Sequence, residues 1–433
     1  MSLIDYNSTT ALLKDRLSPS SVLTKVLYPT LKSKLPVAKL NVFYLFCIGR
    51  ASCCIGAMVF AGALPVTRNE WHMDASSAGS LQTMLNISNA LALFASSWLS
   101  DYFGPRRVYL TFSWLGGIAL LLFGIFAHSY ISAALLIGFI GLTQGGAYTP
   151  AIMLAIQMHN AAKRGYAVGM ILACGSLGYL VSLFISSWGA SNWGTAVAFY
   201  LCAGYVFAGG ITSSFALNKF SDLVPTKPPH SRDKDKINRW NTMTLLLLSG
   251  YIAHCWELLG SWAWTPSLLY TALIPVQNSP VVNSMLIATV IHLSGMLSTI
   301  IVGTISDYFN RTAVLIVMGG MGALCSVLTG WSIVWGTGWV LLCAFIGNFF
   351  ILGDSGVLSA AIADNVEPKV LGRIMGIRSL LGFGIGSFSP LCFGLVMDIT
   401  GSWVFAYSIL AAGGGMAFLA AIMMTYNKEK NFV

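Results

Sequence analysis

The sequence predicts an all-α membrane protein with twelve transmembrane helices in two pseudo-symmetric six-helix bundles. Three observations predict this fold: the composition, the length of the uncharged stretches, and an internal repeat. Of 433 residues, 56% are hydrophobic and only 9% are charged, whereas about 25% of a typical soluble protein is charged. A soluble chain of this composition would lack the charges to cover its surface. The composition therefore argues against a soluble enzyme, a disordered scaffold or a fibrous repeat.

Long stretches without Asp, Glu, Lys or Arg place the helices. These stretches are 75–100, 108–162, 165–218, 258–306, 312–353 and 399–427. One spanning helix needs about 20 apolar residues, so each of the four longest stretches holds two helices, and each helix satisfies its own backbone hydrogen bonds in lipid. We expect spans near 39–62, 77–99, 106–127, 132–156, 165–188, 192–216, 242–270, 283–305, 311–332, 337–361, 372–397 and 402–425.

A hydrophilic segment with three prolines and alternating charges separates six spans from six. It predicts five parts: an N-terminal segment 1–38, a first bundle 39–216, a linker 217–241, a second bundle 242–425 and a tail 426–433. Within the N-terminal segment, an apolar stripe with lysines nearby predicts a short helix on the membrane surface. The stripe consists of Val22, Leu23, Val26, Leu27 and Leu31.

The basic residues orient the chain. Of the 24 Lys and Arg residues, 21 fall in segments that this topology puts on one side. Only Arg68 lies in a loop on the other side, while Arg50 and Arg378 lie inside spans. The positive-inside rule predicts a multi-pass protein of the cell (inner) membrane with both termini in the cytoplasm. This bias also explains the net charge of +9 without a nucleic-acid partner.

No motif in the sequence indicates a cofactor, a metal or a catalytic centre. The nine cysteines all fall within predicted spans and lack metal-ligand spacing, so they are interpreted as packing residues. We see no P-loop and no nucleophile–base arrangement. The chain is therefore predicted to be a transport protein rather than an enzyme, to bind no cofactor and no metal, and to function as a monomer in the lipid bilayer.

The two halves share short repeated motifs. The letters S-D-Y-F occur at 100–103 and again at 306–309. Two weaker echoes, 165–169 with 372–376 and 191–193 with 401–403, have nearly the same offset. Their equal places in the predicted topology support a duplicated bundle.

The segment S-W-L-S-D-Y-F-G-P-R-R at 97–107 resembles the G-x-x-x-D-(R/K)-x-G-(R/K)-(R/K) motif of the major facilitator superfamily. Asp101, Gly104 and Arg106 match that motif, whereas Ser97 and Tyr102 depart from it. The second half has G-T-I-S-D-Y-F-N-R at 303–311, which keeps Gly303, Asp307 and Arg311. The resemblance extends over essentially the whole chain and implies two bundles that rock about a central site.

These loops have a physical interpretation that does not need the family. Asp101 stands near the positive N-terminus of the third helix, Gly104 permits a tight turn, and Arg106 can pair with Asp101 or with helix-end carbonyls. We expect Asp101, Gly104 and Arg106, with Asp307 and Arg311, to latch the bundles in an outward-open state. The alternative is a simple turn that carries positive-inside arginines.

Two departures from the family's motifs argue against a drug–proton antiporter. In the fourth span, Gly141 stands where an Arg linked to proton transport usually lies. In the fifth span, the stretch 169–178 is rich in Gly but has no Pro, and its glycines favour close helix packing.

Charged residues inside spans are functional candidates, because a charge in lipid needs a cavity or a partner. Arg50 and Glu257 lie near mid-membrane at equivalent stations, 207 positions apart, and His254 is one turn before Glu257. A desolvated carboxyl favours its protonated form, so Glu257 is our candidate proton carrier; the alternative is a static Arg50–Glu257 bridge. Trp256 and Trp262 are expected to line a substrate pocket before the helix-breaking Pro266, or else simply to pack.

Asp354 and Arg378 form a second candidate pair, each about 10 Å from the same side of the membrane. They are either a buried ion pair, or Arg378 contacts substrate and exchanges partners with Asp354, which then takes part in proton coupling. His292, Asn86 and Asn89 are weaker cavity candidates.

We expect a secondary active transporter working by alternating access. Two intramembrane arginines favour an anionic substrate, since guanidinium suits carboxylate and phosphate geometry. The first choice is proton-coupled uptake of a small organic anion, with substrate bound by Arg50, His254, Trp256, Trp262 and Arg378 and protons by Glu257 and Asp354. The alternative is a proton-linked exporter of a drug or metabolite.

Overall fold

A computed structural model describes residues 37–159, 164–218, 220, 241–276, 279–366 and 368–430. The expected surface helix in the N-terminal segment and most of the linker lie outside the described residues. The arrangement below concerns the unit Leu45–Val433.

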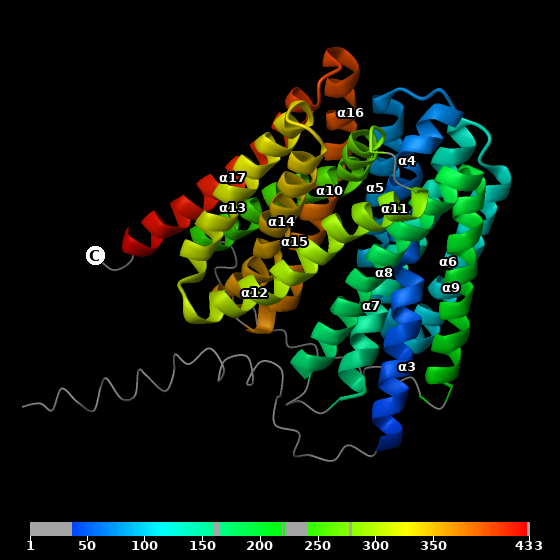
Figure 1. Ribbon diagram of the computed structural model, residues 1–433. Helices are drawn as coiled ribbons and strands as arrows, with labels where there is room; N and C mark the ends of the chain where they lie inside the picture. The colour runs from blue at the N-terminus through cyan, green and yellow to red at the C-terminus, as the bar shows by residue number, and fades with distance from the viewer. Residues whose placement is uncertain are drawn as a thin grey trace, which may run out of the picture. The chain divides into compact units, whose positions relative to one another are not determined.

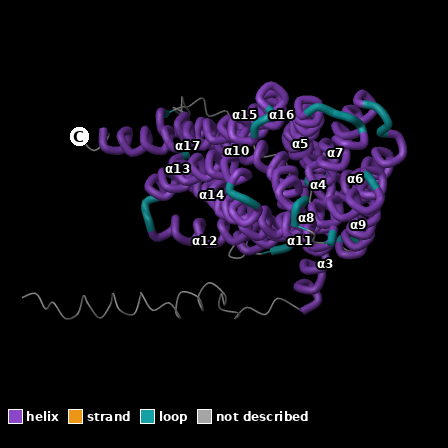
Figure 2. Tube along the Cα trace, turned by 45° about the horizontal axis from the view of Figure 1, so that its top comes forward, coloured by secondary structure: helices purple, strands orange, loops and turns teal. Residues whose placement is uncertain are grey.

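The described residues contain helices and connecting loops but no strands (Figures 1 and 2). In the first half the helices are α3 (Val37–Cys53), η1 (Cys54–Ala57), α4 (Val59–Glu70), α5 (Ala75–Phe103), α6 (Pro105–Phe126), α7 (Tyr130–Gln157), α8 (Arg164–Trp193) and α9 (Thr195–Ala216). In the second half they are α10 (Thr242–Leu273), α11 (Pro280–Ala288), η3 (Thr289–Leu293), α12 (Ser294–Tyr308), α13 (Arg311–Trp331), η4 (Ser332–Val334), α14 (Thr337–Asn365), α15 (Pro368–Gly386), α16 (Ser389–Thr400) and α17 (Trp403–Lys430). These helices make up the twelve predicted spans in the predicted order.

Three of the spans are interrupted, which the sequence analysis did not anticipate. The first consists of α3, η1 and α4, the eighth contains the π-helical turn η3, and the eleventh breaks between α15 and α16. The last break precedes Pro390, which lies in the first turn of α16, where the missing proline N–H costs nothing. By contrast, Pro266 does not break its helix: α10 continues through it to Leu273, in agreement with the expected span 242–270.

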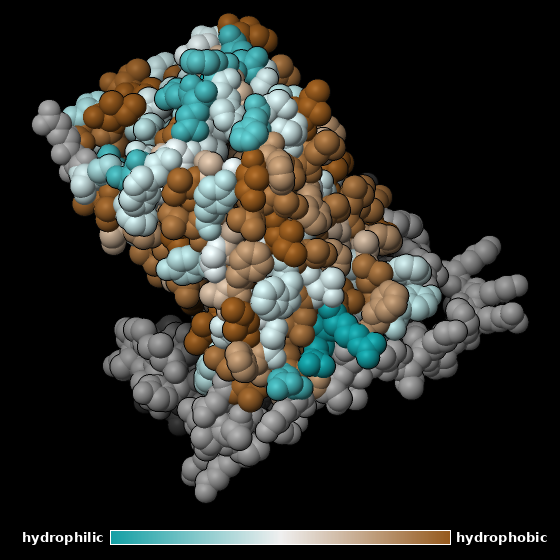
Figure 3. Space-filling view, turned by 90° about the vertical axis from the view of Figure 1, so that its right-hand side faces the viewer, coloured by the Kyte–Doolittle hydropathy of each residue, from teal (hydrophilic) through white to brown (hydrophobic). Residues whose placement is uncertain are grey.

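Among the described residues, eleven helical segments are long and apolar enough to cross a membrane. The remaining span, α5, is the second along the chain; it has 29 residues but is not one of these eleven segments. It is more polar because it buries Gln82, Thr83 and Asn86. Figure 3 shows mostly hydrophobic side chains between hydrophilic groups gathered toward the two ends of the helices. Large exposed side chains such as Phe94, Leu135 and Phe215 belong to this apolar surface, as lipid contact requires.

We name the two faces by their connections. The linker face is the end at which α5 meets α6 at Gly104, and the opposite face is the end at which α8 meets α9 at Gly194. The halves meet near the opposite face, where α5 crosses α16 and α8 packs on α11. Glycines permit this close approach: a Cβ on Gly79 would lie 2.3 Å from the Pro390 carbonyl oxygen, and one on Gly394 would lie 2.3 Å from the Ala75 carbonyl oxygen.

Hydrogen bonds between the halves lie at the same face. The Asp398 carboxylate accepts from the backbone N–H groups of Ala75 and Ser76, both at 2.7 Å. Ser284 donates to Ser187 at 3.1 Å. Within the described residues these are the three hydrogen bonds that join the halves, so the structure is held closed at the opposite face.

Candidate functional site

Arg50, on α3, is a buried cation without a charged partner in the part of the chain that the structure describes. Its side chain is 3% exposed, and its Nε and Nη1 atoms have no hydrogen-bond partner among the described residues. The guanidinium carbon lies 5.8 Å from the ring centroid of Tyr148 on α7, and its other neighbours include Tyr179 and the thiol of Cys54. A buried charge without compensation is costly, so this arrangement is suited to receiving an anion.

Arg378, on α15, approaches the same region from the second half. Its guanidinium carbon lies 3.9 Å from the ring centroid of Tyr251 on α10, and its Nη1 donates to the Ser359 hydroxyl at 2.6 Å. Its Nε has no partner among the described residues. The charges of Arg50 and Arg378 both act on Tyr148. Tyr148, which the sequence analysis missed, is therefore within electrostatic reach of both predicted arginines.

Three rings from both halves border this region. Tyr179 of α8 lies 5.7 Å from Trp262 of α10 and 5.8 Å from His292 of η3, centroid to centroid. Trp262 and His292 are 5.9 Å apart. Because Tyr179 is also close to Arg50 and Tyr148, the rings extend the arginine site. Trp262 and His292, two of the residues that the sequence analysis expected to line a cavity, thus lie beside each other.

Trp256 does not lie with the rings of Tyr179, Trp262 and His292. Its indole Nε1 donates to the Ile409 carbonyl of α17 at 3.0 Å, and the indole packs where Gly413 leaves space. Positions 256 and 262 differ by about 240° around a helix of 3.6 residues per turn. The expectation that both tryptophans line one pocket is therefore wrong.

The structure does not join Glu257 to Arg50. The Glu257 carboxyl is buried, and its Oε1 accepts from the Ser326 hydroxyl of α13 at 2.6 Å. It occupies space left by two glycines, Gly322 of α13 and Gly414 of α17. Glu257 therefore faces the interior of the second half, which contradicts the alternative of a static Arg50–Glu257 bridge.

Asp354 pairs with His254 rather than with Arg378. The distance from His254 Nδ1 to Asp354 Oδ1 is 2.6 Å, with side chains 2% and 7% exposed. This is an ion-pair distance, although its angles do not make a hydrogen bond, since Oδ1 has no hydrogen-bond partner among the described residues. Asp354 also acts electrostatically on Glu257. His254, Asp354 and Glu257 thus form one buried titratable cluster between α10, α13 and α14.

The expected latch residues lie at the linker face. Gly104 has φ +86° and stands at the N-cap of α6, so the predicted tight turn is present. Asp101 is exposed at the end of α5, and Arg106 is half-buried in the first turn of α6. In the second half, Arg311 Nε donates to Asp364 Oδ2 on α14 at 2.6 Å. The side chain of Asp307 lies outside the described residues.

The weaker cavity candidates Asn86 and Asn89 lie on α5. Gln82 donates to Asn86 at 3.3 Å, and the Asn86 amide nitrogen has no partner among the described residues. Asn89 lies against Gly145 of α7. The part of the chain that the structure describes holds no group of three or more His, Cys, Asp or Glu residues arranged to bind a metal.

The chain is similar to known transporters along most of its length. The model of the Major Facilitator Superfamily matches residues 46–390. The Probable sulfoacetate transporter SauU of Cupriavidus necator is 23% identical over 395 residues, covering 84% of this chain and 88% of that protein.

Solved structures share the fold at low sequence identity. An inward-facing bacterial homolog of the human lysosomal transporter Spinster matches with a TM-score of 0.69 and 12% identity, covering 90% of this chain and 97% of its own. The D-xylose–proton symporter matches with a TM-score of 0.68 and 14% identity, covering 89% and 97%.

Proposed function

Because the chain belongs to the Major Facilitator Superfamily and is a multi-pass membrane transporter, we propose that it takes up a small organic anion together with protons. The observation that carries this proposal is the buried Arg50 guanidinium, two of whose nitrogens have no partner among the described residues. A planar guanidinium presents two parallel N–H groups to a carboxylate or sulfonate. An arriving anion would supply the compensation that the protein does not.

The surroundings of Arg50 favour a small organic molecule. Tyr148 offers a phenol ring 5.8 Å from the Arg50 guanidinium carbon, and Tyr179 and Trp262 offer apolar ring faces. The name of the similar Cupriavidus necator protein, a sulfoacetate transporter, supports an organic anion as the substrate class.

The buried cluster of His254, Asp354 and Glu257 supports proton coupling. A positioned carboxyl group can accept and release a proton, and the His254–Asp354 pair and the Ser326 hydroxyl hold the two carboxyls in place. Tyr251 connects this cluster to the arginine site, since its ring lies 5.8 Å from the His254 ring and 3.9 Å from the Arg378 guanidinium carbon. Protonation of the His254, Asp354 and Glu257 cluster would thus affect Arg378 in the substrate site through Tyr251.

In the proposed cycle, the linker face is cytoplasmic and the present closure at Asp398 holds the outer side shut. The bundles then rock about the arginine site, as alternating access requires. Anion and proton enter from outside when the Asp398 contacts break, and both leave when these contacts form again.

Purified protein in liposomes tests the proposal. An inward-directed proton gradient should drive accumulation of labelled short carboxylates or sulfonates, and collapsing the gradient should abolish the accumulation. Arg50→Ala should abolish it too, whereas Ile48→Ala, at an exposed position of the same helix, should not. Transport of cations but not of anions by the wild-type protein would refute the anion assignment.

A further inference from the structure

Two cavities lie in line inside the second half, away from the arginine site. The outer cavity has a volume of about 230 Å³ and is lined at the linker face by Arg311, Asp364 and Asn365. The inner cavity has a volume of about 10 Å³ and is lined by Asp354, Gly250 and Leu358. The outer cavity is large enough for several water molecules at about 30 Å³ each, and the inner cavity is about the size of a single water.

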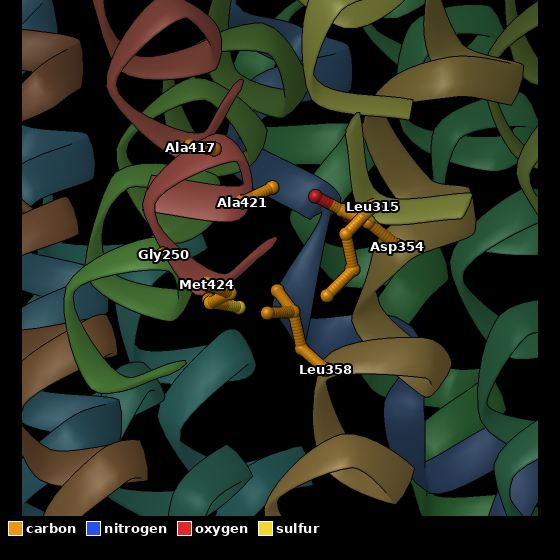
Figure 4. Close-up of a pocket in the computed structure, with 7 residues that line it drawn as sticks. All are labelled: Gly250, Leu315, Asp354, Leu358, Ala417, Ala421 and Met424. Carbon is orange, nitrogen blue, oxygen red and sulfur yellow. The ribbon is translucent and has the colours of Figure 1, made fainter. Parts of the chain in front are cut away.

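Leu315 of α13 and Met424 of α17 line both cavities. Figure 4 shows Leu315 and Asp354 on one side of the inner cavity, with Met424 and Ala421 on the other. Both Leu315 and Met424 are buried, and because they line both cavities they lie where the outer cavity approaches the one that Asp354 lines. Asp354 lies about 15 Å deeper along α14 than Asp364, ten residues at 1.5 Å each.

The inner end of this line is the titratable cluster. Two residues of α10, His254 and Glu257, are the titratable neighbours of Asp354. Cys255, also on α10, lies within electrostatic reach of Asp354 and of Arg378 on α15. The lining residues from α17 are Ala417, Ala421 and Met424, which carry no charge. Asp354 Oδ1 lacks a hydrogen-bond partner among the described residues, so it can accept one from a water in the inner cavity.

We propose that these cavities are a proton route from the linker face to Asp354, gated by Leu315 and Met424 and separate from the path of the substrate. The proton leaves a hydronium ion in the outer cavity, crosses through a single water, and forms a new O–H bond on the Asp354 carboxylate; the return transfer reverses both changes. The proposal rests on the proposed proton coupling of transport. It predicts that proton exchange and substrate exchange can be impaired separately.

The test uses substitutions that enlarge the gate residues Leu315 and Met424 and leave the residues of the substrate site unchanged. Leu315→Phe and Met424→Phe add volume between the cavities, and Leu324→Phe and Met423→Phe are matched controls at exposed positions of the same helices. Because the larger rings fill the space through which the bridging water must pass, the gate variants should slow proton-driven accumulation in liposomes by roughly tenfold. Counterflow exchange of labelled for unlabelled anion, which needs no net proton movement, should stay within about twofold of the wild type.

Leu315→Ala provides a second measurement, because it should speed proton exchange instead of slowing it. Accumulation at the wild-type rate in folded Leu315→Phe and Met424→Phe would overturn the route. Equal losses of accumulation and counterflow would also overturn it, because a shared path is then blocked. If the wild-type protein shows no proton-driven accumulation of any anion, the coupling itself fails, and that result is distinct from a coupled protein with unaffected gate variants.

Discussion

Asp398 of α16 caps the N-terminus of α5 from across the two halves, with its carboxylate oxygens 2.7 Å from the backbone nitrogens of Ala75 and Ser76. The positive end of a helix stabilises an anion, and Arg68 adds its charge to the same carboxylate. These contacts join the halves at the place where Gly79 and Gly394 allow α5 and α16 to approach each other closely. Alternating access requires that they separate.

Removing the charge of Asp398 should therefore loosen the closure of the opposite face. A hydrogen bond to a charged group contributes about 1.5–3 kcal/mol, so Asp398→Asn should increase the open population by roughly tenfold. Ser267→Cys, at a buried position of α10, reports opening by its labelling rate from that face when the native cysteines are replaced. Asp398→Glu should restore slow labelling in part. An unchanged labelling rate in Asp398→Asn would show that the Asp398 contacts do not hold the opposite face closed.

Substitutions of Arg50 should show whether the anion needs the bidentate guanidinium group or only a positive charge. Arg50→Lys keeps the charge but loses the bidentate geometry, so the apparent Km for the anion should rise roughly tenfold, as expected for about 1.4 kcal/mol of lost binding. Arg50→Ala should abolish binding although the protein still inserts into the membrane. The measurement is uptake with a titration of substrate, and wild-type kinetics in Arg50→Ala would eliminate the role.

Tyr251 should hold Arg378 in place by its ring. A desolvated cation–π contact contributes about 2 kcal/mol, so Tyr251→Leu should weaken anion binding by roughly tenfold or more. Tyr251→Phe keeps the ring and should stay close to the wild type, as should Tyr205→Leu at an exposed position of α9. Binding is measured by substrate protection against thermal unfolding; equal affinity in Tyr251→Leu and Tyr251→Phe would contradict this assignment.

Glu257→Gln should separate coupling from binding. The amide can still accept from Ser326 but cannot release a proton, so accumulation driven by a proton gradient should be lost while counterflow persists. Accumulation at the wild-type rate and pH dependence in this variant would rule out a proton role for Glu257.

Asp74 predicts a pH dependence of stability outside the membrane. The side chain and backbone N–H of Ser77 donate to its carboxylate and lower its pKa. A lowered pKa in the folded state stabilises the fold above the usual Asp range, and this contribution is lost as pH falls through the lowered value. Asp74→Ala should cost about 1 kcal/mol, typical of a lost N-cap. Thermal unfolding should show this difference at neutral pH, and the difference should shrink as pH falls below the usual Asp range through the lowered pKa.

The sequence by itself determined the membrane class, the number and order of the spans and the duplicated motifs. These properties follow from local composition, because a helix in lipid must satisfy its own backbone hydrogen bonds whatever surrounds it. Composition also identified Arg50, Glu257, Asp354 and Arg378, since a charge in a span is conspicuous along the chain.

Only the tertiary structure decided which of these residues meet. Asp354 lies beside His254 instead of Arg378, and Glu257 turns to Ser326 because Gly322 and Gly414 leave room for its carboxyl. Tyr148 and Tyr179 carry no charge and follow no motif, so nothing in the sequence distinguished them from lipid-facing tyrosines. Partner choice depends on the rotation and packing of neighbouring helices, and periodicity along one helix does not specify either.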